Sequence, residues 1–167
     1  MAWTNPKTWL PNIALTASEL NQQVRDNLKA IGDPWTAYTP TWSASTTNPV
    51  LNNGTIAGRY IKPGNLLFFR INLTMGSSTT FGSGAYALTL PPGIAIHAAG
   101  LQLVHAEAVI GSATYTCRGR ISAGTSSVLL YTLPATAGTF DRAVTQASPA
   151  TFASGSSLTV QGFVEAA

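Results

Sequence analysis

The pattern of apolar and polar positions changes once along the chain, at residue 34. Between residues 16 and 31 the apolar side chains recur at helical spacing, and further on they alternate with polar ones. The change falls at Gly32-Asp33-Pro34, where the proline cannot continue a helical hydrogen-bond ladder. We therefore divide the chain into an N-terminal arm and helix, residues 1–33, and a β-rich body, residues 34–167.

The stretch LTASELNQQVRDNLKAI predicts a helix with well-marked ends. Thr16 is the expected N-cap, and Glu19 three residues later completes a capping box, in which each side chain bonds the backbone N–H of the other residue. Gly32 is expected to end the helix in the left-handed conformation that glycine adopts readily. About 15 helical residues, roughly 22 Å, would lie between these ends.

The predicted helix has one narrow apolar stripe and is otherwise polar. The stripe consists of Leu20, Val24, Leu28 and Ile31. A stripe this narrow is typical of a coiled-coil seam, and a helix of this length is marginally stable alone in water. We expect these residues to serve oligomerisation or anchoring. Docking on the body of the same chain, on copies of the helix, or on another protein all stay open.

Beyond residue 34 the sequence predicts strands. In LLFFRINLTM the apolar residues occupy alternate positions, which is the pattern of a half-buried antiparallel strand. Further strands are expected near residues 55–61, 84–90, 101–110, 113–121, 126–133 and 157–165, with Gly, Pro, Ser and Asn clusters between them. The fold class predicted is therefore mainly β: an antiparallel, jelly-roll-like β-sandwich with one short N-terminal α-helix.

The stretch SVLLYTL departs from this alternation. Val128 and Leu130 fall on one side of the expected strand, and Leu129, Tyr131 and Leu133 on the other, so both sides are apolar. Such a strand is either covered by a neighbouring subunit or central in the sheet and covered by a long loop. The sequence leaves both interpretations open.

Composition narrows the possible functions. Only 9% of the residues are charged, against about 25% in typical soluble domains, and 45% are hydrophobic. The net charge is +3, but the basic residues are scattered and form no run, so we expect no nucleic-acid partner. No apolar run approaches the roughly 20 residues of a membrane span, and the N-terminus lacks the layout of a secretory signal. We expect no membrane insertion.

Metal and thiol chemistry also find little support. Cys117 is the only cysteine, so no disulfide can form within the chain, and we interpret it as a small buried side chain in a strand. His97 and His105 lie at no recognised metal-ligand spacing. We therefore predict neither a metal site nor a cofactor.

Three aromatic residues follow the Gly-Asp-Pro break: Trp35, Tyr38 and Trp42. In an extended segment Tyr38 and Trp42 share a face, and Pro40 restricts that segment to a sheet edge. The rings could form a platform for a glycan, because aromatic faces supply apolar area for a sugar ring. The alternative is that they pack the junction between the helix and the body.

The charged residues of the body suggest no catalytic site. Arg118 and Arg120 flank Gly119 and point to the same side of a strand, so they either bind an acidic polymer or pair with Glu107 or Asp141. A glycosidase needs two carboxylates held across the scissile bond, and nothing in the sequence arranges such a pair. We therefore predict that the protein is not an enzyme.

Both ends of the chain resemble a known group of proteins. TWLPNIALTASELNQQVRDNLKAIGDP is similar to a leader found on small tail and fibre proteins of bacteriophages that infect actinobacteria, with its LTA, LN and VRDNL elements. YTPTWSASTTNPVLNNGTIAGRYIKPGN looks like the start of the β-domain that follows this leader. SPATFASGSSLTVQGFVEAA is similar to the ending of the group, which usually has Trp in place of Phe152 and an acid near Ser156.

This resemblance implies a virion protein, assembled in the cytoplasm of a bacterial host. It implies a homotrimeric fibre or spike of the tail or baseplate, or a head fibre, that contacts other virion proteins through its N-terminal segment. A host cell-surface glycan is the expected external partner. The alternatives are a capsid decoration protein without a receptor role and a cell-wall polysaccharide-degrading enzyme.

Overall fold

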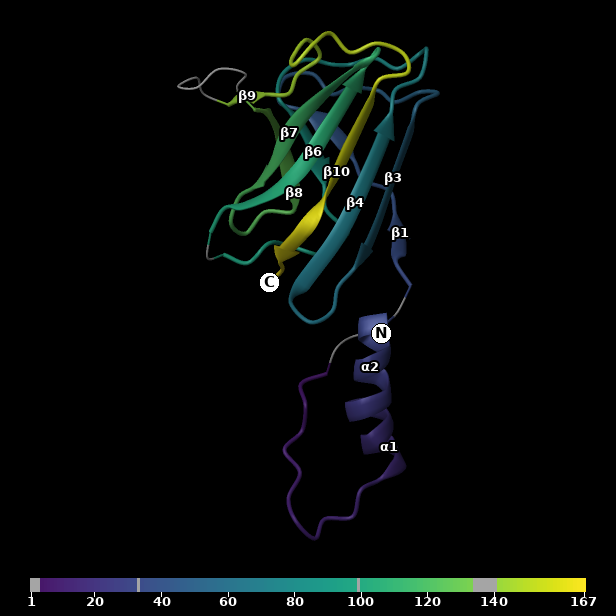
Figure 1. Ribbon diagram of the computed structural model, residues 1–167, viewed down its shortest axis with the longest axis vertical. Coiled ribbons are helices and arrows are strands. Elements are labelled where there is room, and N and C mark those ends of the chain that lie inside the picture. The colour runs from purple at the N-terminus through teal and green to yellow at the C-terminus, as the bar shows by residue number, and fades with distance from the viewer. Residues whose placement is uncertain (1–3, 33, 99, 134–140) are drawn as a thin grey trace.

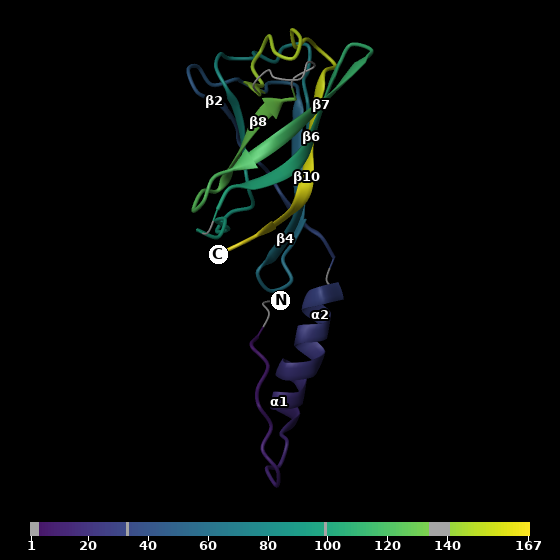
Figure 2. The ribbon, with the colours of Figure 1, turned by 60° about the vertical axis from the view of Figure 1, so that its left-hand side comes forward.

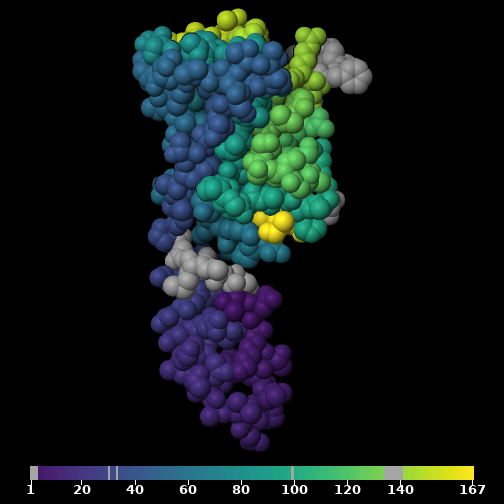
Figure 3. All heavy atoms as spheres, turned by 180° about the vertical axis from the view of Figure 1, so that it is seen from behind, coloured from purple at the N-terminus to yellow at the C-terminus, as the bar shows by residue number. Residues whose placement is uncertain are grey.

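The computed structural model describes residues 4–32, 34–98, 100–133 and 141–167, and it has two visibly different parts (Figure 1). A helix with an extended segment beside it stands clear of the strand-rich body, at the end where the body chain begins. Figure 3, seen from behind, shows the N-terminal residues in purple gathered below the body. The helix therefore does not lie on the sheets of its own chain.

The body is one antiparallel sheet that curls into two layers. The strands run in the order β1-β3-β4-β10-β6-β7-β8-β5-β2, and β9 pairs with β8. In Figure 2, β4, β10 and β6 lie in one layer, and β8 and β2 lie in the other. The bounds are β1 Thr36–Tyr38, β2 Trp42–Ala44, β3 Thr55–Ile61, β4 Leu66–Thr74, β5 Tyr86–Thr89, β6 Gln102–Ile110, β7 Ala113–Ile121, β8 Ser127–Thr132, β9 Arg142–Ala143 and β10 Ser157–Glu165.

The alternation of the sequence decides which side chains enter the core. On β4, Phe69, Ile71 and Leu73 are buried, and Arg70 and Asn72 between them are exposed. The inward side chains of the other strands meet them between the layers, and Tyr86 and Leu158 are among the fully buried ones. These observations confirm a mainly β, antiparallel, sandwich-like fold with one short helix.

The two edge strands come from one short segment, at sheet edges as Pro40 indicated, although the sequence did not predict their bounds. β1 pairs with β3 at one edge of the sheet, and β2 pairs with β5 at the other. Between them Pro40 is buried, and Thr41 and Thr89 exchange two hydrogen bonds of 2.8 and 3.1 Å. This crossover therefore joins the two edges of the curled sheet.

Strand β8, the predicted two-sided apolar strand, lies inside the sheet between β7 and β5. Val128 and Leu130 are buried, whereas Leu129 and Tyr131 on the outer side are half-buried. The Arg120 guanidinium lies over the Tyr131 ring, 4.9 Å from its centre. The strand is therefore central, and a subunit contact on its outer side stays a prediction.

The helix differs from expectation in two respects. It runs without interruption through α1 (Ala17–Leu20), η1 (Asn21–Asp26) and α2 (Asn27–Gly32), but η1 is a π-helix. The prediction of a left-handed Gly32 was wrong, because this residue is still helical and does not have a positive φ. Residue 33, which follows it, lies outside the described residues.

Candidate functional site

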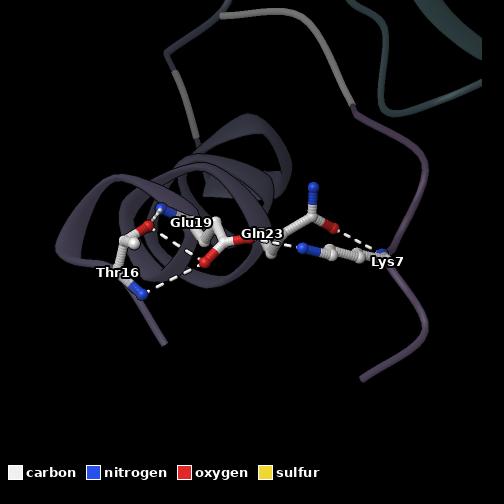
Figure 4. A network of polar contacts seen from close by, with 4 residues as sticks. All are labelled: Lys7, Thr16, Glu19 and Gln23. Carbon is white, nitrogen blue, oxygen red and sulfur yellow. Dashed lines mark hydrogen bonds and ion pairs between the residues drawn. The ribbon is translucent and has the colours of Figure 1, made fainter. Parts of the chain in front are cut away.

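The helix begins with the predicted capping box, and Lys7 of the N-terminal arm extends it (Figure 4). The backbone N–H of Glu19 donates to Thr16 Oγ1 at 3.2 Å, and the Thr16 N–H donates to Glu19 Oε2 at 3.1 Å. The Lys7 ammonium donates to the other carboxylate oxygen. The Lys7 hydrogen bond, followed by those from Thr16, lowers the pKa of Glu19 to about 2.

A row of polar side chains holds the arm against the helix. Asn27 is buried and exchanges two 2.9 Å hydrogen bonds with the backbone of Thr4, one as donor and one as acceptor. The Lys7 N–H donates to Gln23 Oε1 at 2.6 Å. With Glu19, these residues form a row at spacings of four. Amide side chains thus satisfy arm backbone groups that a strand neighbour would otherwise satisfy.

The π segment brings positions four apart closer to a straight row. Four residues of an α-helix turn about 40° too far, because one turn takes 3.6 residues. A π turn closes i→i+5 hydrogen bonds and needs more residues, so it corrects this drift in the opposite direction. The row from Glu19 to Asn27 and the adjacent row from Leu20 to Leu28 both cross the π segment. Both rows therefore drift less around the helix than they would in a regular α-helix.

The four residues of the predicted oligomerisation stripe are uncovered in the single chain. Leu20, Val24, Leu28 and Ile31 are 43%, 48%, 65% and 55% exposed. In the arm from residue 4 onward, the large apolar side chains are exposed too, namely Trp9, Leu10, Ile13 and Leu15. The arm covers the row of Glu19, Gln23 and Asn27 and leaves the apolar stripe exposed. The helix does not dock on the body of its own chain (Figure 1), and its association with copies of itself or with another protein stays a prediction.

The three aromatic residues of the predicted glycan platform do not come together. Trp42 is buried at 8% exposure and meets Tyr86 edge-to-face, with ring centres 5.1 Å apart. Tyr38 is half-buried over Gly58, where an added Cβ would lie 2.3 Å from its ring, and burial raises the Tyr38 pKa. Only Trp35, at 41% exposure, faces outward. Tyr38 and Trp42 therefore pack at the crossover.

Trp35 lies in a groove on the outer face of the layer formed by β3, β4, β10 and β6, the layer in front in Figure 1. Strand register builds an aromatic row there. Phe68 of β4 pairs with Ile61 of β3 on one side and with Phe163 of β10 on the other. Trp35, just before β1, lines the same groove. The Phe163 ring is 66% exposed and presents apolar surface to the groove.

A row of polar residues runs beside the aromatic row, two residues away on β3, β4 and β10. Arg70 pairs with Arg59 on one side and with Gln161 on the other. Gln161 pairs in turn with His105 of β6. At about 4.8 Å between strands, the row from Arg59 to His105 spans roughly 14 Å. Residues far apart in sequence thus form one continuous surface.

The sheet opens beside the groove. Pairing between β10 and β6 ends at Gln161 and His105. Beyond that point the Gln102 side chain takes over, exchanging bonds of 2.9 and 2.7 Å with the backbone of Glu165. Gly162 lies in this opening, where an added Cβ would be 2.8 Å from Val104 Cγ1. The groove has a volume of about 660 Å³.

The other sequence candidates have structural roles. Arg118 forms an ion pair with Asp141, which confirms one of the two predicted pairings. Cys117 is buried, as predicted, and burial raises its pKa to about 11. Among the described residues, no three His, Cys, Asp or Glu side chains are grouped to hold a metal ion. None of the helices in the described ranges has the length and apolarity needed to span a membrane.

Comparison with known proteins yields a likeness of fold. Neither a family model nor a curated protein sequence matches the chain. The crystal structure of the Dettilon tailspike protein matches with a TM-score of 0.53 and 15% sequence identity. The match covers 80% of this chain and 24% of the tailspike chain. At this identity the likeness concerns the fold alone: this chain is similar in fold to part of the tailspike chain.

Proposed function

We propose that the protein is a structural component of a bacteriophage virion, a homotrimeric fibre or spike of the tail or baseplate that assembles through its N-terminal helix. The observation that carries this proposal is the bare apolar stripe on a helix held clear of the body. In a soluble monomer this apolar surface would stay in contact with water, which is unfavourable in free energy, whereas helix association buries it. The likeness of fold to a tailspike protein supports the same conclusion.

Other copies of the helix are the proposed occupants of the stripe. Apolar rows at spacings of four and three suit helix-to-helix packing, and the π segment reduces the drift of the row around the helix. We propose three copies because the N-terminal sequence resembles that of tail and fibre proteins, and this resemblance implies a homotrimer. The outer ends of the arm and helix remain available to other virion proteins.

A contact with the host surface is the second part of the proposal. The body has no need of its outer-face aromatic residues for stability, since Phe163 and Trp35 are exposed and its core is complete without them. We propose that this contact is one of binding and not of catalysis. Asp141, one of the few carboxylates of the body, is engaged by Arg118. The native protein should release no sugar from host cell walls, and neither should the Glu107→Gln and Asp141→Asn variants.

The experiment for assembly replaces Leu20 and Val24 by Ser. The native protein should give a light-scattering mass three times the 17.4 kDa of the chain, and the double variant should give the mass of one chain. The matched control replaces Gln22 and Lys29 by Ser, because these residues are exposed on the same helix but outside the stripe. An unchanged oligomer in the Leu20 and Val24 variant would reject the stripe as the assembly seam.

The location on the particle needs a separate experiment. Antibodies against the body should label the tail of intact phage particles in electron micrographs. Labelling distributed evenly over the head would instead identify a capsid decoration protein. Absence of the protein from purified particles would overturn the proposal.

A further inference from the structure

The outer-face groove carries positive charge that the described residues do not neutralise. Arg59 and Arg70 lie directly opposite each other on β3 and β4. Like charges in this position destabilise a sheet. The residues that line the groove include no carboxylate, and the polar contact recorded for Arg70 is a 3.3 Å hydrogen bond to Asn72. A bound anion would offset the repulsion between the two guanidinium groups.

The aromatic row gives the groove a second type of contact. Trp35 and Phe163 present exposed ring surface next to the two arginines, although the body core is complete without them. Flat apolar surfaces of this kind bind the faces of sugar rings, while amide and imidazole groups such as Gln161 and His105 hydrogen-bond hydroxyl groups. A ligand that contacts both the aromatic row and the row of Arg59 and Arg70 is a chain of rings that carries negative charge along one side.

We propose that this groove binds an acidic saccharide whose sugar rings carry carboxylate groups. The rings lie along Trp35 and Phe163, and the carboxylates reach Arg59 and Arg70, whose planar guanidinium groups match a carboxylate in shape. The saccharide chain runs across the strands, along the two rows. This inference deepens the host-contact part of the proposed function and rests on it, but the binding itself does not depend on assembly.

Two other occupants fit the groove less well. A second copy of the chain, related by symmetry, brings identical residues together near its axis, and two arginines on each copy would then repel. A nucleic-acid strand needs a longer basic track than the groove offers, and the net charge of the whole chain is only +3. Both remain as outcomes of the experiment below.

The experiment measures binding of hexagalacturonate to the full chain by isothermal titration calorimetry. Maltohexaose is the neutral probe, and hexathymidylate is the nucleic-acid probe. We expect binding of hexagalacturonate alone. Arg59→Gln and Arg70→Gln should each weaken it about tenfold, the typical loss for one charge-assisted hydrogen bond. Trp35→Ala should weaken it several-fold.

Matched controls separate the groove from general effects. Arg142→Gln removes an exposed arginine on β9, and Trp9→Ala removes a tryptophan of the arm that is 41% exposed, the same as Trp35. Neither variant should change the affinity. Equal losses in these controls, equal binding of maltohexaose or hexathymidylate, or no binding of hexagalacturonate would overturn the inference.

Light scattering on the same samples distinguishes this inference from the proposed assembly. A protein that is monomeric yet binds hexagalacturonate would reject the assembly and support the groove. An oligomer that does not bind it would leave the assembly intact and overturn the groove. If the Leu20 and Val24 double variant binds and the oligomer does not, a second copy covers the groove and the inference fails.

Discussion

The N-terminal unit, which is the arm and helix of residues 4–32, and the β-body are each stabilised by a different kind of contact. In the body, apolar side chains fill the space between two layers, and polar residues face outward. In the N-terminal unit, the polar side chains of Glu19, Gln23 and Asn27 face inward against the arm, and the apolar residues face outward. The body therefore completes its own core, whereas the N-terminal unit leaves its large apolar side chains exposed in the single chain.

The largest effect should come from opening the core of the body. Phe69 is 1% exposed on β4, and Phe69→Ala should cost about 3–5 kcal/mol of the free energy of unfolding through lost burial and a residual cavity. Urea unfolding monitored by far-UV circular dichroism measures this loss. The control is Phe163→Ala, which removes an exposed ring and should cost less than about 0.5 kcal/mol. Equal losses would mean that a partner buries Phe163.

An intermediate effect should follow from releasing the arm. Asn27→Ala leaves the Thr4 N–H and C=O without their recorded partner, at a cost of about 1–3 kcal/mol. This loss should be confined to the N-terminal unit. Hydrogen exchange should accelerate at the Thr4 amide and remain unchanged in the body strands. Asn21→Ala, at an exposed position of the same helix, should leave both unchanged. Faster exchange in the body would contradict the independence of the two parts.

The smallest effect concerns the helix start and its dependence on pH. The folded-state pKa of Glu19 lies below its ordinary value of 4.5, so its contribution is fully present above pH 4.5 and is lost as the pH falls toward 2. The titration of the Glu19 carboxyl carbon, followed by NMR in the full chain, should therefore have its midpoint near 2. Lys7→Ala should move the midpoint upward, since the Lys7 hydrogen bond is the main cause of the shift. An unmoved midpoint would contradict this assignment.

The strands and the helix start could be predicted because their signals are local. β3 spans Thr55–Ile61 and β10 spans Ser157–Glu165, as the alternation indicated. The capping box needs only Thr16 and Glu19, which are three residues apart. The role of Gln23 and Asn27 was missed, because polar residues on a helix usually face water. Their spacing of four, parallel to the apolar stripe, was the available signal.

The groove could not be predicted, because its residues come from several strands whose order the sequence does not reveal. Gln161 and Phe163 reach Arg70 and Phe68 only because β10 lies between β4 and β6. The aromatic platform failed for a related reason. Trp35, Tyr38 and Trp42 lie on one segment, but that segment passes from one sheet edge to the other, and its side chains enter different environments.

The crossover at Pro40 has a mechanical consequence. A pull on the helix enters the body through the three residues of β1, which alone would peel away one hydrogen bond after another. Here further extension must first draw the Tyr38 ring off Gly58 and then extract Pro40 and Trp42 from buried positions. Tension on the helix therefore reaches the second edge of the sheet only after the first edge has given way. Such a two-step anchorage suits a body that is attached at one end and pulled at the other.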